Sequence, residues 1–185
     1  MSLKKLTQSK HSNAERSWFA ALMISGKISN KQYAVYLKQQ FECYNALEKR
    51  FDKAGETVVS LPRDLKRANN IIDDLQELSC EVDSIPIFDS TKKYVNYILD
   101  ECKTKNLYAH VYVRYLGDLK GGQIIAKRVP GSGTYYKFKN PKELEIFIRS
   151  QLCEDEEFVK ECNNCFDASI LLFENLKNYL EKRAD

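Results

Sequence analysis

The chain has 185 residues, of which 43% are hydrophobic and 30% charged, the ordinary balance of a globular protein with one full core. A net charge of +3 is too small to indicate a nucleic-acid partner, and no apolar run approaches the roughly 20 residues that span a bilayer. We therefore expect a single domain over 1–185, located in the cytoplasm, with no secretory leader, membrane anchor or nucleic-acid partner.

Apolar residues recur every three or four positions between the few glycines and prolines, a pattern typical of amphipathic helices. The pattern predicts helices over about 14–26, 29–51, 62–78, 89–102, 107–128, 141–148 and 154–182. Only Val58–Val59 and Thr134–Phe138 have a strand-like composition, and both segments are short. The sequence therefore predicts an all-α bundle of roughly six to eight helices.

The segment Tyr112–Gly122 is the most informative part of the chain. Three glycines, Gly117, Gly121 and Gly122, lie where the flanking residues favour a helix. Each glycine costs a helix on the order of 1 kcal/mol, whereas a backbone without Cβ can approach a flat ligand closely. Asp118 lies among these glycines. We expect a kinked helix, with a carboxylate at the kink, that covers a reactive ligand.

The chain has two histidines. His11 lies four residues before Glu15, so a continuous helix would place both on one face, where the carboxylate could orient a metal-binding imidazole. Ser12 and Glu15 also match a capping box, which would leave His11 outside the helix, and an exposed pair on a terminal helix is the commoner outcome of this spacing. His110, eight residues before Asp118, is more typical of a hydrogen-bonded core side chain than of a metal ligand.

Six cysteines occur at irregular spacing, and we expect most of them to be reduced packing residues. Cys162 and Cys165 form a C-x-x-C pair. Because no second pair supplies zinc ligands and no βαβ pattern surrounds it, a metal or redox role is the less favoured interpretation.

One family resembles this sequence over nearly its whole length. The residues AHVYVRYLGDLKGGQ at 109–123 resemble the distal-helix signature of heme oxygenases, AHAYTRYLGDLSGGQ, and His11–Glu15 resembles the proximal H-x-x-A-E segment. Three further matches follow in the family's order: Y-x-A-L-E at 44–48, L-P-R-D-L at 61–65 and L-F-E-x-L at 172–176. The resemblance implies the all-α heme oxygenase fold, in which heme lies between a proximal and a distal helix.

The resemblance also implies a reaction and its partners. Heme b, as both cofactor and substrate, would be opened by O₂ to biliverdin, expected as the IXα isomer, with release of Fe²⁺ and carbon monoxide. A ferredoxin or a similar acidic reductase would supply electrons, which suits the mildly basic chain. A bilin reductase is a candidate downstream partner, and a monomer is expected. A heme carrier without turnover and a non-heme hydrolase of the thiaminase type are the alternatives.

The same resemblance assigns the central residues of the site. His11 would bind the iron with Glu15 as its hydrogen-bond partner. Gly117, Gly121 and Gly122 would bring backbone over the porphyrin. Asp118 would anchor a water chain that delivers protons to the reacting oxygen.

The remaining matched positions surround that centre. Tyr44, Tyr112 and Arg114 match positions in the proton-relay network. Lys4 and Arg149 match residues that bind the heme propionates, and Phe166 matches an aromatic wall of the pocket.

Four positions depart from the family pattern. Lys120 replaces the usual serine, Val113 the usual threonine, and Ser169 stands where asparagine is common. Glu145 stands where some members carry a lysine on the propionate side. These departures bear on which meso carbon is attacked and on the water network.

Overall fold

The computed structural model describes residues 2–78 and 82–183, and helices are the only regular elements within these ranges. The α-helices are α1 (Leu3–Glu15), α2 (Trp18–Ser25), α3 (Asn30–Ala54), α4 (Ala68–Glu77), α5 (Asp89–Asn96), α6 (Leu107–Val113), α7 (Tyr115–Ile125), α8 (Pro141–Ser150) and α9 (Glu156–Glu181). The short helical segments are η1 (Gly55–Thr57), η2 (Arg63–Leu65), η3 (Val82–Ser84), the π-helical turn η4 (Tyr97–Glu101), η5 (Thr104–Asn106) and η6 (Thr134–Tyr136). The predicted all-α class is confirmed.

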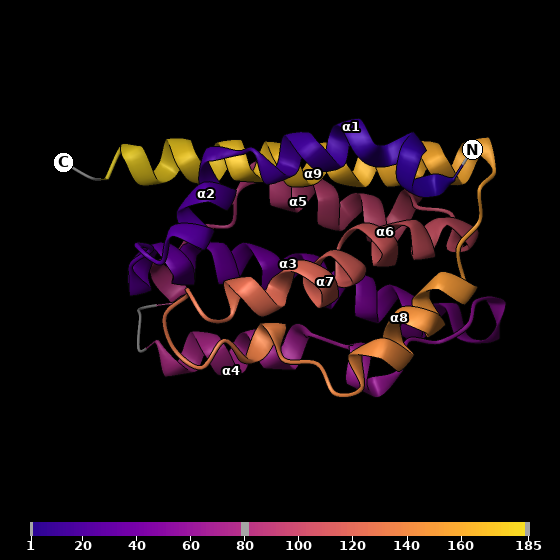
Figure 1. The fold of residues 1–185 in the computed structure, drawn as a ribbon, viewed down its shortest axis with the longest axis horizontal. Coiled ribbons are helices and arrows are strands. Elements are labelled where there is room, and N and C mark those ends of the chain that lie inside the picture. The colour runs from indigo at the N-terminus through magenta and orange to yellow at the C-terminus, as the bar shows by residue number, and fades with distance from the viewer. Residues whose placement is uncertain (1, 79–81, 184–185) are drawn as a thin grey trace.

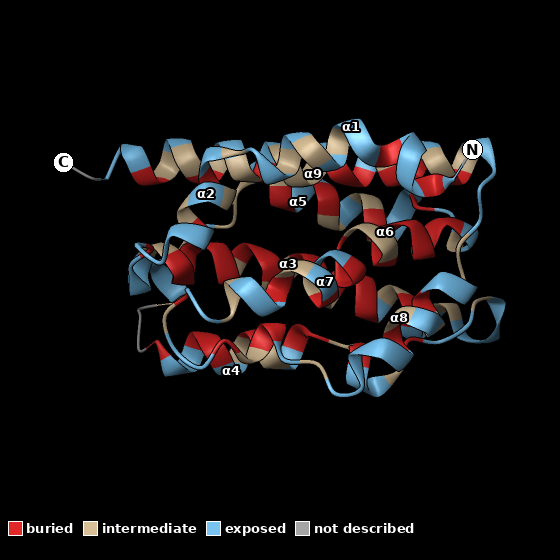
Figure 2. Ribbon diagram, viewed as in Figure 1, coloured by how far each residue is buried: buried red, intermediate tan, exposed pale blue. Residues whose placement is uncertain are grey.

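The long helices lie roughly along one axis of the molecule (Figure 1). Helix α1 packs along α9 at one edge, α3 and α7 occupy the middle, and α4 and α8 form the opposite edge. Buried residues concentrate on α3, α6 and the inner face of α9 (Figure 2). None of the described helices is both long enough and apolar enough to cross a membrane.

The predicted start of the second helix is confirmed by its cap. The Ser29 hydroxyl accepts a hydrogen bond from the Gln32 backbone N–H at 3.3 Å, and the Gln32 side-chain oxygen accepts one from the Ser29 N–H at 2.9 Å. This reciprocal capping box satisfies two N–H groups that the helix itself leaves unpaired.

The first predicted helix, over 14–26, is wrong in its boundaries. Helix α1 ends at Glu15, and α2 begins at Trp18 because Ser17 caps it, accepting from the Ala20 N–H at 3.1 Å. His11 lies inside α1, so the capping-box interpretation that placed it outside a helix is also wrong.

The break in the predicted helix over 107–128 also lies elsewhere than expected. Helix α6 ends at Val113 and α7 begins at Tyr115, so the break falls at Arg114 rather than at the glycines. Backbone hydrogen bonds still pass through it, from Arg114 N–H to the His110 carbonyl and from Asp118 N–H to the Arg114 carbonyl, both at 2.9 Å. The three glycines therefore lie within a continuous helical segment.

The strand-like segment Thr134–Phe138 contains a 3₁₀ turn and no strand. The cause lies in α4, where the buried Asp74 carboxylate accepts from the Thr134 N–H at 2.7 Å and from the Tyr135 N–H at 2.9 Å. These two bonds fix the turn and direct Tyr135 inward, where it is 1% exposed.

Four cysteines, Cys43, Cys102, Cys162 and Cys165, are buried and free, as expected of packing residues. Cys153 departs from that prediction because it is exposed. The sixth, Cys80, lies outside the described residues.

Candidate functional site

A cavity of about 410 Å³ brings together residues from five separate stretches of the chain. Its polar lining includes His11, Arg114 and Asp118, and its floor includes Gly117 and Gly121. Its apolar walls comprise Phe19, Met23, Ile24, Ile125, Phe166 and Phe173. A neighbouring cavity of about 490 Å³ shares His11, Gly117, Gly121 and Phe166 and adds Lys4, Tyr112 and Arg149. The two cavities together form a largely apolar cradle with a basic edge.

His11 projects into both cavities from the middle of α1. Its Nδ1 atom lies 3.4 Å from a Glu15 carboxylate oxygen, and its ring meets the Phe166 ring edge-on at 5.8 Å. The side chain is 46% exposed. Because Nδ1 faces the carboxylate, Nε2 is the nitrogen left to bind a metal, the arrangement that fixes the tautomer of a ligating histidine.

The three glycines of α7 divide into two kinds. At Gly117 and Gly121, which line the cavities, a Cβ atom would have no neighbour within 4 Å, so both leave open space in front of the helix. At Gly122 a Cβ atom would lie 2.5 Å from the ring of the buried Tyr136. Gly122 lines neither cavity, and the Tyr136 ring packs against it, so packing alone already requires a glycine here.

Asp118 lies at the cavity wall and accepts hydrogen bonds from two tyrosines. One comes from the Tyr44 hydroxyl and the other, at 2.8 Å, from the Tyr135 hydroxyl. The pKa of Asp118 is raised from 3.8 to about 6, because the effect of burial exceeds the lowering by the two tyrosine hydrogen bonds and by the charges of Arg114 and Arg67. A carboxyl with this pKa exchanges a proton readily near neutral pH.

Tyr135 is the residue of this network that the sequence did not reveal. It lies in a segment read as strand-like, and its position depends on Asp74, 61 residues away. The only local signal is an aromatic pair, Tyr135–Tyr136, two residues after the end of the chain-breaking segment Pro130–Gly133. Such a pair indicates burial but not the direction of the hydroxyl.

Within the described residues, neither Arg114 nor Tyr112 forms a direct hydrogen bond with Asp118. The Arg114 Nε atom donates to the Tyr94 hydroxyl at 2.9 Å, and its guanidinium lies 4.3 Å above the Tyr94 ring centre. The Tyr112 hydroxyl lies 3.4 Å from that of Thr7 on α1. Arg114 thus reaches the cavity beside Asp118, whereas Tyr112 lines only the second cavity.

The basic edge of the second cavity explains two departures from the family pattern. The Glu145 carboxylate pairs with Lys120 at 2.8 Å and with Arg149 at 2.9 Å. Lys120 and Glu145, both unusual residues, therefore compensate each other's charge. Lys4, also at this cavity, is exposed.

The other two departures have simple environments. The Ser169 hydroxyl donates to the Cys165 carbonyl at 3.0 Å and lines the first cavity. Val113 lines both cavities at the end of α6.

Comparison with known proteins agrees with this geometry. The sequence model of the heme oxygenase family matches residues 1–175. The chain is 29% identical to the heme oxygenase of Rhodella violacea, with 96% of this chain and 86% of that protein covered. It is 26% identical to heme oxygenase 2 of Rattus norvegicus over 94% of this chain, and it spans only 64% of the length of that relative.

Solved structures give the same result. Heme oxygenase-1 from Synechocystis sp. PCC6803, in complex with heme, superimposes with a TM-score of 0.85 at 25% identity, covering 98% of this chain and 93% of that one. Heme oxygenase from Leptospira interrogans superimposes with a TM-score of 0.80 at 26% identity, covering 94% and 97%. This chain belongs to the heme oxygenase family.

Proposed function

We propose that the chain opens heme b oxidatively to biliverdin IXα, with release of Fe²⁺ and carbon monoxide, using O₂ and electrons from a ferredoxin or a similar acidic reductase. The observation that carries this proposal is one cavity in which a carboxylate-paired imidazole, two glycines and a carboxyl of raised pKa converge. Family membership supports the same activity.

The residues of the cradle fit a metalloporphyrin. His11 offers Nε2, a nitrogen donor of the kind that binds heme iron, and Glu15 holds its other nitrogen. The walls are apolar, and Gly117 and Gly121 leave space that any side chain would fill. Lys4 and Arg149 lie at the edge, where they would pair with the two propionates. When bound, heme supplies both the iron centre that activates O₂ and the ring that is oxidised.

The protein's own contribution is to hold and move protons. With a pKa of about 6, Asp118 releases and recovers a proton across the working pH range. The Tyr44 and Tyr135 hydroxyls hold the carboxylate of Asp118, which directly follows Gly117 in α7. Glycine at 117 and 121 provides no competing ligand and no barrier between that carboxylate and the cavity. Asp118 is thus the proton donor in this proposal.

The partners follow from charge. The cations Lys4, Lys120 and Arg149 lie at the open edge of the site, where an acidic electron donor would approach. Through the propionates, Lys4 and Arg149 would fix the in-plane rotation of heme and hence the IXα isomer. The proposal further comprises a monomer in the cytoplasm and a bilin reductase as the consumer of the product.

A spectroscopic assay tests the proposal. Hemin is added to the chain, followed by reductant and O₂, and the absorption spectrum is recorded. We expect a Soret band from histidine-ligated heme, then its loss as a biliverdin band grows, and chromatography of the product identifies the isomer. A heme spectrum that persists under electron supply would indicate a heme carrier instead, and no Soret band would indicate a non-heme protein.

A further inference from the structure

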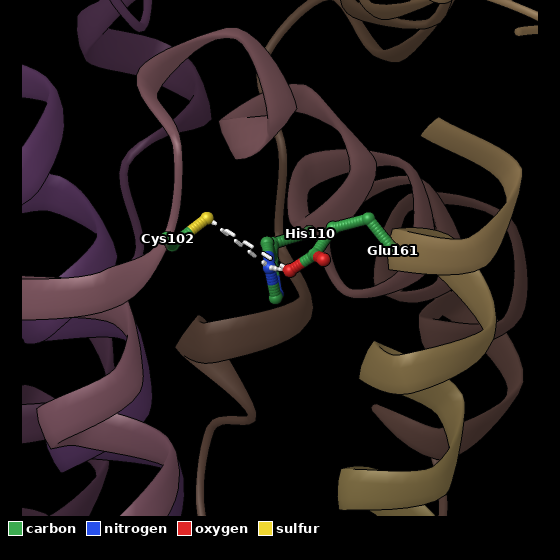
Figure 3. Close-up of side chains that lie close together, drawn as sticks. All are labelled: Cys102, His110 and Glu161. Carbon is green, nitrogen blue, oxygen red and sulfur yellow. Dashed lines mark hydrogen bonds and ion pairs between the residues drawn. The ribbon is translucent and has the colours of Figure 1, made fainter. Parts of the chain in front are cut away.

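A second cluster of reactive side chains lies outside the cradle, where three elements meet (Figure 3). Cys102 directly follows the π-helical turn η4, His110 lies on α6, and Glu161 lies on α9. The three residues are 3%, 1% and 5% exposed. The proposed function uses none of them.

We infer that Cys102, His110 and Glu161 form a binding site for one zinc ion or a chemically similar divalent transition-metal ion. Thiolate, imidazole and carboxylate are the three side-chain ligands that Zn²⁺ takes in proteins, and a mixed set of this kind disfavours Mg²⁺ and Ca²⁺. The three potential ligand atoms already point toward one another (Figure 3). This inference does not depend on the proposed heme chemistry.

The distances between the ligand atoms suit a tetrahedral ion. Cys102 Sγ lies 3.7 Å from His110 Nε2 and 3.8 Å from Glu161 Oε1, and Nε2 lies 2.8 Å from Oε1. Normal zinc–ligand bond lengths place such atoms about 3.3 to 3.6 Å apart. The sulfur contacts need to shorten only slightly, and the His110–Glu161 pair must open by about 0.5 Å.

Hydrogen bonds from surrounding tyrosines would orient two of the ligands. The Tyr94 hydroxyl lies 2.9 Å from His110 Nδ1, the ring nitrogen that points away from the site. The Tyr97 hydroxyl donates to Glu161 Oε1 at 2.7 Å. Metal-binding histidines and carboxylates are usually held by such outer partners, so the cluster has the second layer of contacts that a functional site needs.

A separate cavity leads from the surface toward the cluster. A cavity of about 310 Å³ is lined by His110, Tyr94 and Tyr97 at its inner end and by the exposed Lys93 and Asn164 at its outer end. It is distinct from the heme cradle, because none of its lining residues lines either cavity of the cradle. Of the three ligands only His110 lines this cavity, so solvent reaches the cluster from the His110 side, from which an ion and a coordinating water molecule would approach.

Charge and proton balance also favour a divalent ion. Together with the Cys102 thiolate and the Glu161 carboxylate it gives zero net charge, which lowers the cost of burial. On binding, two protons leave for solvent, one from the Cys102 thiol and one from His110 Nε2, where it faces the Glu161 carboxylate in the metal-free cluster. His110 then coordinates through Nε2 as a neutral imidazole and keeps a proton on Nδ1, from which it donates to the Tyr94 oxygen. The Tyr94 proton then turns toward Cys165 Sγ, 3.9 Å away.

Cobalt titration tests the site. The full chain, prepared without heme or metal, is titrated with Co²⁺ and then with Zn²⁺. We expect one equivalent of Co²⁺ to give a thiolate-to-cobalt charge-transfer band with the visible bands of tetrahedral cobalt, and Zn²⁺ to remove both. X-ray absorption of the zinc form should show one sulfur and otherwise nitrogen or oxygen ligands.

Variants locate the site. Cys102→Ser should abolish the charge-transfer band and weaken zinc binding by about tenfold or more, whereas Cys153→Ser, which changes the exposed thiol, should alter neither. Glu161→Gln should weaken binding and keep the band. Wild-type protein without a stoichiometric band, zinc without a sulfur ligand, or a band that survives in Cys102→Ser would each overturn the inference. The wild-type measurements decide the matter even where a variant fails to fold.

Discussion

The cradle has a distal wall, formed by α7 with Asp118, and a proximal wall, formed by α1 with His11. The two walls differ in how firmly the protein itself holds these side chains in place. On the distal wall, Asp118 is held by Tyr44 and Tyr135, and Tyr135 is held in turn by Asp74. On the proximal wall, His11 is 46% exposed, and its carboxylate partner is 65% exposed. The buried residues of α1 are Leu3 and Thr7, both before the ligand position. The fold therefore holds Asp118, the proposed proton donor, in a fixed position, whereas His11, the proposed iron ligand, has few neighbours that hold it in place without heme.

The largest expected effect lies on the weakly fixed proximal wall. His11→Ala removes the iron ligand, so heme turnover should fall to background and the histidine-type Soret spectrum should be lost. Added imidazole should restore both, because the His11 side chain is half-exposed and its removal leaves a space that imidazole can enter from solvent. Absorption spectra and biliverdin yield with and without imidazole measure this. Normal turnover without imidazole would show that another residue binds the iron.

On the distal wall, removal of the carboxyl should spare binding and impair chemistry. Asp118→Asn keeps a hydrogen-bond acceptor for Tyr44 and Tyr135 but cannot release a proton. We expect a histidine-ligated heme spectrum with biliverdin formation slowed by about 100-fold or more. Single-turnover kinetics measure it, with Tyr135→Phe as a milder control. An unchanged rate would exclude Asp118 as the proton donor.

The same variant tests whether burial of the ionised Asp118 carboxylate lowers the stability of the folded chain. Because burial raises the pKa of Asp118 to about 6, the folded chain holds this proton more tightly than the unfolded chain. Stability is therefore unaffected below about pH 4, falls as pH rises toward 6, and stays lower above it, by at most about 3 kcal/mol. The melting temperature of Asp118→Asn should exceed that of the wild type at pH 7.5 and equal it near pH 4. If the two proteins had equal melting curves at both pH values, burial of the ionised Asp118 carboxylate would cost no stability, contrary to this account.

A pair of glycine variants separates packing from ligand access within one helix. Gly122→Ala places a methyl against Tyr136 and should lower the free energy of unfolding by about 1–3 kcal/mol. In Gly117→Ala the added methyl has no neighbouring atom within 4 Å, so the free energy of unfolding should stay equal or rise by up to about 1 kcal/mol. The same methyl should weaken heme binding, because it occupies the cavity. Denaturant unfolding and hemin titration of both variants measure this. Identical behaviour of the two would remove the distinction.

The smallest effect concerns the basic edge. Glu145→Gln removes the carboxylate that pairs with Lys120 and Arg149 and frees both cations for the propionates. Since exposed ion pairs are weak, heme affinity should rise only about two- to fivefold, and the gain should vanish at high salt. Hemin titration at two salt concentrations checks it. A lower affinity would mean that Glu145 itself supports the site.

The sequence predicted the parts of this structure that depend on local patterns. Periodicity predicted the helices, Ser29 predicted the start of α3, and the four-residue spacing of His11 and Glu15 anticipated their pairing. The distal signature located Asp118. These features are set by residues within one or two helical turns of each other, so they can be read without knowing the fold.

The sequence did not predict what distant packing decides. Gly117, Gly121 and Gly122 read alike, but only contact with Tyr136 distinguishes the third from the others. Tyr135 joins Asp118 because Asp74, on a different helix, holds its backbone. The convergence of Cys102, His110 and Glu161 likewise requires three elements whose arrangement no local pattern specifies.

A crystal structure of the chain with hemin would test the central claim most directly. We predict a macrocycle between α1 and α7, His11 Nε2 on the iron, and backbone of Gly117 and Gly121 over the opposite face. The Tyr44, Asp118 and Tyr135 side chains should superimpose on the heme-free structure, with the larger shifts in α1. A macrocycle bound elsewhere, or a distal wall that rearranges while α1 stays fixed, would contradict the account.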